Sequence, residues 1–332
     1  MTIVEISNKF PTELHAVQHF EAIRWGKKVK CAYCISTDIG SRNADMRFHC
    51  RSCKKTFSVT TASGLHNTRL PLKTWMFAFA VITDAKKGVS AKQLERNLGL
   101  SYETALDMYH RIRGFMAIEN LEIGTLDGVV EMDETFVGGK PRKFNDGKTD
   151  GKYEPKPIPK LDKRIKELKS QGFDLSRKKG NPAQSDLNPK RGRGTDQIPV
   201  TGIVERDGNV IAEVMRNLTA KNLQEMVKRH VDTDNSLLIT DTYTGYSNID
   251  RIIENVKVDH HRLYSYKGVN TNSIESFWAI VKRGIIGQYH QVSVRHLPKY
   301  VAEFVFKYNN RKVDDMFETL GRISMMNKDF HQ

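Results

Sequence analysis

The chain has 332 residues, enough for about two domains, and its 53 Lys and Arg residues outnumber its 39 Asp and Glu residues by 14. This positive charge favours a polyanionic partner, above all nucleic acid, although a generic basic surface would also account for it. No stretch approaches the roughly 18 consecutive apolar residues of a membrane span, and the N-terminus lacks the pattern of a secretory signal. We therefore expect a cytosolic protein without membrane contact.

The first predicted element is a short helix within residues 1–26, where apolar residues recur at helical spacing from Leu14 to Ile23 and Gly26 follows as a stop. All four cysteines come next, in the pairs "CAYC" and "CRSC" with fifteen residues between them. Each pair can present two thiolates to one tetrahedral ion, which predicts a zinc ribbon over residues 27–66 with one structural Zn²⁺. Whether this module also contacts DNA stays open. The predicted zinc ligands are Cys31, Cys34, Cys50 and Cys53.

Residues 67–120 predict a small helical domain. After a mostly buried helix in "LKTWMFAFAVITDAKKG", two further helices meet at Gly99, with Ser90 and Ser101 before them as N-caps. This spacing is that of a helix-turn-helix and suggests a DNA-binding segment. An ordinary helical hairpin is an equally good interpretation, because the second helix begins with Glu103 rather than with base-reading donors.

From "TLDGVVEMDETFVGG" the pattern changes to that of a strand, with Glu131 and Asp133 on one side and Met132 and Glu134 on the other. We expect a second domain, residues 124–325, to begin here.

A basic insertion at residues 140–196 interrupts this predicted domain. The segment between Gly138 and Gln197 holds six of the ten prolines, and 17 basic residues against 8 acidic ones. Such a segment cannot bury enough apolar surface to offset the entropy lost on ordering, so we expect it to be mobile.

The pattern after the insertion predicts a mixed sheet with helices on its faces. Two strands form a hairpin at Asp207-Gly208, and a helix, a strand ending at Asp241, a shorter helix, a further strand and two terminal helices follow. The predicted fold class is therefore α/β, with the zinc ribbon and the helix-turn-helix-like domain ahead of the sheet.

Three acids lie where strand ends and a helix start could bring them together, namely Asp133, Asp241 and Glu275. Their oxygens suit Mg²⁺ or Mn²⁺, and two such ions could activate an attacking hydroxyl and stabilise a departing oxygen. Each acid also has a structural explanation. Asp133 could be an ordinary strand-end residue, and Asp241 could N-cap the next helix. Glu275 could complete a capping box with Asn272. A functional site is favoured because Glu275 and Lys282 lie together beside an apolar helical stripe, from which the lysine can reach a phosphate.

These motifs resemble those of bacterial insertion-sequence transposases of the DDE class, in the branch with an N-terminal zinc ribbon. The resemblance rests on "MDETFVGGK", "IPVTGIVERDG", "ITDTYTGY", "NSIESFWAIVKRGIIGQYH" and the ribbon followed by "FSVTTASGLHNTRLPLKTW". It implies a ribonuclease-H-like domain that uses two Mg²⁺ or Mn²⁺ ions to cleave the transposon ends and joins the freed 3′ hydroxyl to target DNA. By motif, it also implies that Asp133, Asp241 and Glu275 are the catalytic acids and that Lys282 is the basic residue seven positions further on.

The implied partner is double-stranded DNA, both the transposon ends and the target, in a bacterial cytoplasm and on the nucleoid when bound. Because two ends must be held together, we expect at least a homodimer on DNA. The chain departs from the family pattern in two places. Asn270 stands where relatives often have His, and the insertion is longer than usual, with charge that could add DNA contacts.

Two further functions remain open from the residues alone. The chain could be a non-catalytic DNA-binding regulator built from the ribbon and the helical domain. It could also be a nuclease or relaxase with a covalent tyrosine intermediate near the adjacent His260 and His261. Adjacent histidines lie on opposite sides of a strand and cannot jointly grip one metal, which weighs against the nuclease or relaxase. Its candidate nucleophiles are Tyr243, Tyr246, Tyr264 and Tyr266.

Overall fold

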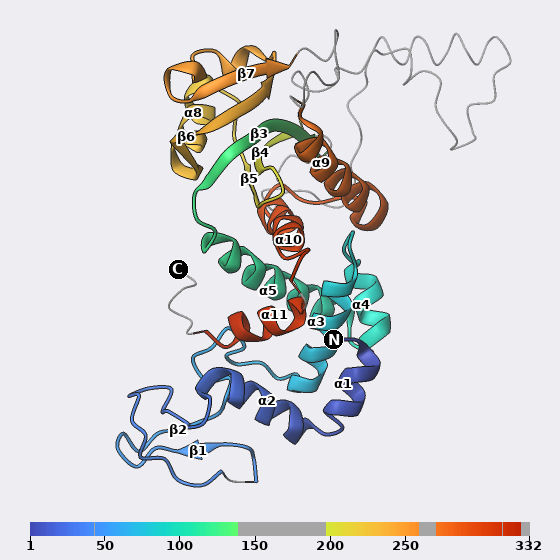
Figure 1. Ribbon diagram of the computed structural model, residues 1–332. Coiled ribbons are helices and arrows are strands. Elements are labelled where there is room, and N and C mark those ends of the chain that lie inside the picture. The colour runs from blue at the N-terminus through green and yellow to red at the C-terminus, as the bar shows by residue number, and fades with distance from the viewer. Residues whose placement is uncertain (43, 139–196, 259–269, 314, 327–332) are drawn as a thin grey trace, which may run out of the picture.

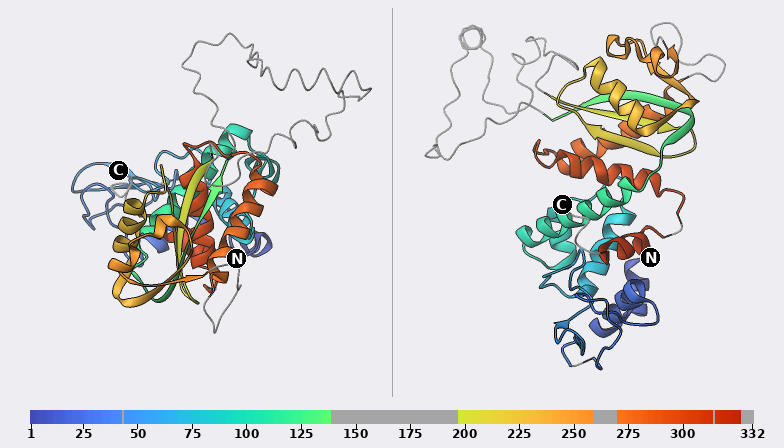
Figure 2. Two further views of the ribbon diagram at one scale, coloured as in Figure 1. Left: turned by 90° about the horizontal axis from the view of Figure 1, so that it is seen from above. Right: turned by 90° about the vertical axis from the view of Figure 1, so that its left-hand side faces the viewer.

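The computed structural model describes residues 1–42, 44–138, 197–258, 270–313 and 315–326. Figures 1 and 2 show an elongated molecule, with the zinc ribbon at one end, a helical body in the middle and a sheet at the other end. The predicted basic insertion lies outside the described residues, as do Tyr264 and Tyr266.

A five-stranded mixed sheet has the order β5-β4-β3-β6-β7 (Figure 1). Its first three strands in sequence form an antiparallel meander, whereas β6 and β7 run parallel to β3. This is the topology of the ribonuclease-H fold, so the predicted α/β class is confirmed. The β4–β5 hairpin turns at Asp207, which takes the positive φ of 58° that a tight hairpin turn requires. The strands are β3 (Leu126–Val137), β4 (Ile198–Glu205), β5 (Val210–Val214), β6 (Val231–Asp241) and β7 (Glu254–Val258).

Helices cover both faces of this sheet because the strands present apolar side chains on each side. On one face α8 (Ala220–His230) packs against Met132 and its neighbours. On the other face α9 (Asn272–Gly284) and α10 (Leu297–Asn309) pack against Val200 and its neighbours. The sheet is thus covered by helices on both faces.

Gly202 of β4 lets α9 lie directly against the sheet. A Cβ at this position would come within 2.8 Å of Trp278 and 3.0 Å of Ile274, both on α9. Gly202 pairs with Asp133 across the β3–β4 ladder, so the missing side chain brings α9 close to the strand that carries this acid.

The link between β6 and β7 differs from the shorter α-helix that we expected. It forms two 3₁₀ turns, η2 (Thr244–Tyr246) and η3 (Ile249–Arg251). Asn248 between them takes a left-handed φ of 64°, which interrupts a continuous helix. Tyr246 and Ile249 are thereby directed into the core beneath α8.

The helical body has an apolar core of its own. Within it, α4 and α5 meet at Gly99, and the hydroxyl oxygens of Ser90 and Ser101 accept the predicted N-capping bonds at 3.1 and 3.3 Å. The last helix, α11, also packs into this core, although it falls in the range 124–325 predicted for the second domain. The domain boundaries given in the sequence analysis therefore remain predictions. The helices are α1 (Ile3–Lys9), α2 (Glu13–Trp25), α3 (Leu72–Asp84), α4 (Ala91–Leu98), α5 (Tyr102–Leu121) and α11 (Met316–Ser324).

Across the described parts of the chain, no helix combines the length and the apolar character needed to cross a membrane.

A buried polar cluster joins the helical body to the helices beneath the sheet. Glu303 on α10 is fully buried and bonds to Arg113 of α5 at 2.9 Å and to Lys307 at 2.7 Å. The hydroxyls of Tyr109 and Tyr289 also donate to this carboxylate. Burial alone would raise the pKa of Glu303, but the Lys307 and Arg113 cations outweigh it and lower the pKa to about 2.

We expect Glu303→Gln to destabilise the protein by about 3–5 kcal/mol at pH 7, because it leaves two buried cations without their counter-charge. The native pKa lies below the ordinary value of 4.5, so the stabilisation is complete above pH 4.5 and is lost as the pH falls towards 2. Denaturant unfolding at pH 7, 5 and 3.5 would measure the deficit, which should shrink at the lowest pH. Glu225→Gln, at an exposed i,i+4 pair on α8, is the control and should change little. A deficit independent of pH would contradict this account.

Candidate active site and zinc centre

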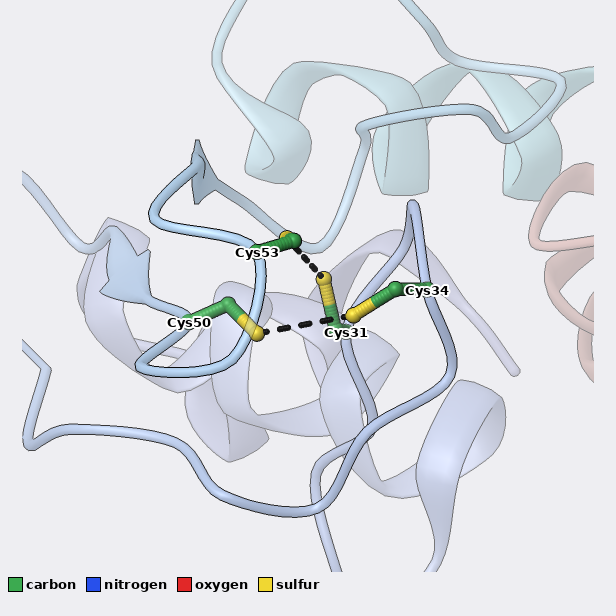
Figure 3. A group of neighbouring side chains, drawn as sticks. All are labelled: Cys31, Cys34, Cys50 and Cys53. Atoms are coloured by element: carbon green, nitrogen blue, oxygen red, sulfur yellow. Dashed lines mark hydrogen bonds between the residues drawn. The ribbon is translucent and has the colours of Figure 1, made fainter.

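The four cysteines converge at one point in the ribbon (Figure 3). The Sγ atoms of Cys31 and Cys53 lie 3.7 Å apart, and those of Cys34 and Cys50 lie 3.6 Å apart. A tetrahedral zinc site with Zn–S bonds of about 2.3 Å has sulfur–sulfur edges of about 3.8 Å. The thiols therefore already have the spacing of a zinc site, and they are too far apart for a disulfide bond.

The two cysteine pairs form matching knuckles. In the first, the N–H of Ile35 donates to the carbonyl of Cys31, and in the second the N–H of Lys54 donates to that of Cys50. Ile35 and Lys54 take positive φ angles of 61° and 59°, so in each knuckle the backbone turns back directly after the second cysteine of the pair. The strands β1 (Phe48–His49) and β2 (Thr56–Phe57) pair between and after the knuckles. Local turn geometry, rather than a large core, thus positions the four sulfurs.

We expect Cys50→Ser to abolish zinc binding and to unfold the ribbon, because structural zinc supplies about 10–16 kcal/mol to small modules of this kind. Metal analysis of the purified protein should find one zinc per chain for the wild type and none for the variant. Ser52 is exposed in the same knuckle. The control variant Ser52→Ala leaves the cysteine spacing unchanged and should retain the metal. A variant that lacks Cys50 but still holds zinc at full occupancy would exclude the four-cysteine site.

Two predicted acids lie side by side in the sheet. Met132 of β3 pairs with Thr240 of β6, so the next residues, Asp133 and Asp241, are neighbours on parallel strands. We expected Asp133 at the end of its strand, but β3 continues to Val137. Asp133 lies within the central strand β3, at the level where the adjacent strand β6 ends with Asp241.

Glu134 joins this pair, which the strand pattern did not indicate. One carboxylate oxygen from each of Asp133, Glu134 and Asp241 lies within 4.8 Å of the others. We call these three residues the acid cluster. Glu134 is buried, and its Oε2 accepts a hydrogen bond of 2.7 Å from the hydroxyl of Tyr246. The sequence signal for Glu134 was its position next to Asp133, but strand alternation predicted that its side chain would lie on the opposite face of the sheet.

The acid cluster concentrates negative charge in a half-buried position. Burial and the neighbouring Glu134 raise the pKa of Asp133 to about 7, with smaller contributions from Asp241 and Glu275. Hard carboxylate oxygens at this spacing fit a divalent cation such as Mg²⁺ or Mn²⁺, which would offset the repulsion. The donor set is therefore suitable for the metal that the sequence predicted.

Glu275 lies near the acid cluster but not in it. Its carboxylate is not among the described groups that come within 4.8 Å of one another, and the side chain is exposed on the first turn of α9. Its Oε1 accepts a hydrogen bond of 3.0 Å from the hydroxyl of Thr271, the N-cap of α9. The capping box with Asn272 does not form, because Asn272 is already the first helical residue. The catalytic role of Glu275 stays a prediction.

The structure also bears on the roles suggested for Asp241, Lys282 and Tyr246. Asp241 does not N-cap a helix; its Oδ1 accepts the N–H of Tyr243 at 2.9 Å in a tight turn after β6. Lys282 is exposed in the last turn of α9, and its contact with phosphate stays a prediction. Burial and the adjacent Glu134 raise the pKa of the Tyr246 hydroxyl well above its usual range, so this tyrosine is a poor nucleophile.

A mixed sheet with two neighbouring aspartates, in a chain that carries a zinc ribbon ahead of it, is the arrangement that the resemblance to DDE transposases implies. Comparison with protein families supports this class. Residues 175–309 match a family described as the ISXO2-like transposase domain, and residues 11–56 match the transposase zinc-ribbon domain. The chain belongs to the insertion-sequence transposases that carry a zinc ribbon ahead of a DDE domain. Asp241 and Glu275 lie within the matched range, and Asp133 precedes it.

One curated relative is the "Uncharacterized protein in transposable element ISH50" of Halobacterium salinarum. It is 22% identical over 304 residues, which cover 89% of this chain and 90% of the relative. Two solved structures align over 75% of this chain and 78% of theirs, at 10% and 11% identity: "Mos1 transposase paired-end complex with left transposon end" and "Crystal structure of the Mos1 Strand Transfer Complex". Their TM-score of 0.28 is too low to establish a common fold.

Proposed function

We propose that this protein is a DNA transposase that binds the ends of its insertion sequence, cleaves them by two-metal phosphoryl transfer and joins the 3′ hydroxyl to target DNA. The observation that carries the proposal is the acid cluster. Burial and the repulsion between neighbouring carboxylates raise the pKa of Asp133, and both cost stability in the absence of a cation. A chain that keeps such a cluster at an open sheet edge gains from it through metal-dependent chemistry.

The acid cluster supplies oxygen ligands from two adjacent strands, and Glu275 adds a carboxylate from α9. Bound Mg²⁺ or Mn²⁺ would supply Lewis-acid stabilisation of charge on the phosphate. Lys282, two turns along the same helix, would contact a phosphate of the DNA backbone and orient the strand. The hydroxyl of Tyr246 holds Glu134 in place, so the cluster needs little reorganisation when a cation binds.

The proposed partner is double-stranded DNA, with at least a dimer of the protein holding two transposon ends. The net charge of +14 supports attraction to the phosphate backbone. The α4–Gly99–α5 unit and the zinc ribbon are the candidate end-reading modules. This role would place the protein on the nucleoid of a bacterial cell.

The experiment that tests the proposal uses a labelled duplex carrying the element's own terminal repeats. We expect nicks at the repeat boundary with Mg²⁺ or Mn²⁺, none with chelator, and no protein covalently attached to DNA after denaturation. The rival DNA-binding regulator predicts end binding with no cleavage under any metal condition. A denaturation-resistant DNA adduct would instead favour a tyrosine nucleophile and overturn the proposal.

A further inference from the structure

Glu131 is a buried acid beside the acid cluster that plays no part in the proposed chemistry. It lies on β3 two residues before Asp133, on the same side of the strand, and its side chain is fully buried. A carboxylate withdrawn from water in this way requires hydrogen-bonding partners, because an unpaired buried charge is costly.

Both oxygens of Glu131 are occupied by donors from the protein. Oε1 accepts from Arg206 Nε at 2.9 Å and from the Ser273 hydroxyl at 3.1 Å. Oε2 accepts from the backbone N–H groups of Ser273 at 2.8 Å and Ile274 at 3.1 Å. Glu131 is therefore engaged with the start of α9.

The start of α9 depends on this carboxylate. The first N–H groups of a helix have no partner within the helix and are usually capped by the preceding side chain. Here the N-cap residue Thr271 makes no side-chain capping bond, and its hydroxyl donates to Glu275 instead. Glu131 replaces the missing cap from a different element, with its negative charge at the positive end of the helix.

Arg206 completes the connection. Its Nη2 donates to the carbonyl of Asn270 at 2.9 Å, just before the helix, while its Nε holds Glu131. The N-terminus of α9 is thus tied to the strand that carries Asp133, and Glu275 follows Ile274 directly in sequence.

We propose that Glu131 is a positioning residue that fixes the first turn of α9 against β3 and so holds Glu275 within reach of a cation at the acid cluster. This inference rests on the proposed function, because it assumes that Glu275 helps to bind the metal. Glu131 acts through Glu275 and does not bind the ion itself.

The test measures the affinity of the zinc-loaded full-length protein for Mn²⁺ without DNA, from the loss of the free Mn²⁺ signal in electron paramagnetic resonance. Glu131→Gln keeps the shape of the side chain but turns an amide N–H₂ towards N–H donors. We expect it to weaken Mn²⁺ binding about 10–100-fold, the size of loss found when a group that orients a metal ligand is removed. Wild-type affinity in Glu131→Gln would overturn the inference.

A double-mutant cycle separates positioning from general damage. In a Glu275→Ala background, Glu131→Gln should weaken Mn²⁺ binding less than about 2-fold, because the ligand that it positions is already gone. Equal weakening in both backgrounds would overturn the inference. Glu303→Gln is the matched control, since it also removes a fully buried, ion-paired carboxylate, and it should leave Mn²⁺ affinity unchanged. A similar loss of affinity in this control would show that destabilisation alone is responsible.

Two further variants make every outcome interpretable. If Glu131→Gln does not fold, Ser273→Ala removes only the hydroxyl bond to Oε1 and should still weaken Mn²⁺ binding measurably; unchanged binding would overturn the inference. Asp133→Asn should eliminate Mn²⁺ binding. If it binds Mn²⁺ like the wild type, the proposed metal centre itself is wrong, a failure distinct from that of Glu131.

Discussion

Asp133→Asn is expected to lower end cleavage at least about 10³-fold while leaving end binding within about 2-fold of the wild type. Asn keeps the size of the side chain but removes a charged oxygen ligand. A metal ion supplies several kcal/mol of transition-state stabilisation, and each 1.36 kcal/mol lost is a tenfold loss in rate. Cleavage would be followed on a labelled terminal-repeat duplex, and binding on the same duplex by gel shift.

The matched comparison for this prediction uses two aspartates of β6. Asp241→Asn should behave like Asp133→Asn, because its carboxylate belongs to the acid cluster. Asp234→Asn should cleave normally, since Asp234 is exposed and lines an open cavity of about 750 Å³ at the other end of the same strand. Retained cleavage in Asp133→Asn, or an equal loss in Asp234→Asn, would count against catalysis at the acid cluster.

The same Asp133→Asn substitution is expected to stabilise the metal-free protein by up to about 4 kcal/mol at pH 8, equivalent to a rise of about 10 °C in Tm. Burial, and after it the neighbouring carboxylates, raise the pKa of Asp133 from 3.8 to about 7, so its ionisation is disfavoured in the folded state. The native state therefore binds more protons than the unfolded state between these values, and wild-type stability falls as the pH rises from 4 to 7. Asn carries no charge and escapes this loss.

Thermal unfolding of the zinc-loaded protein, dialysed free of Mg²⁺ and Mn²⁺, between pH 4 and pH 8 would measure this gain. The advantage of the variant should shrink steadily below pH 7 and vanish near pH 4. Added Mn²⁺ should raise the Tm of the wild type but not that of Asp133→Asn, because only the wild type binds the ion. A variant less stable than the wild type at pH 8 would show that Asp133 is not under electrostatic strain.

The zinc ribbon, several helix ends and the start of the sheet can be predicted from local sequence patterns. Two C-x2-C pairs have few chemical uses other than one tetrahedral metal, and the spacing of Cys31, Cys34, Cys50 and Cys53 predicts the zinc ribbon. Ser90, Gly99 and Ser101 mark helix ends because capping depends on neighbouring residues alone. The change from helical to strand periodicity near Leu126 likewise predicts the sheet.

The acid cluster was only partly predictable. Strand alternation reports the face on which a side chain lies, but not where the neighbouring strand ends. Because β6 stops at Asp241, the carboxylate of Glu134 reaches the same point as that of Asp133, although successive side chains of β3 point to opposite faces of the sheet. Glu275 is exposed on the first turn of α9 and lies outside the acid cluster.

By itself the sequence determined the modules: a zinc ribbon, capped helices and an α/β sheet with aspartates on two strands, because local spacing and periodicity indicate each of them. Only the tertiary structure decided that Glu131 caps α9 from β3, that Glu134 joins the acid cluster and that α11 packs among the N-terminal helices. These arrangements depend on strand order and on packing between residues more than a hundred positions apart or on where a neighbouring strand ends, and no local periodicity encodes them.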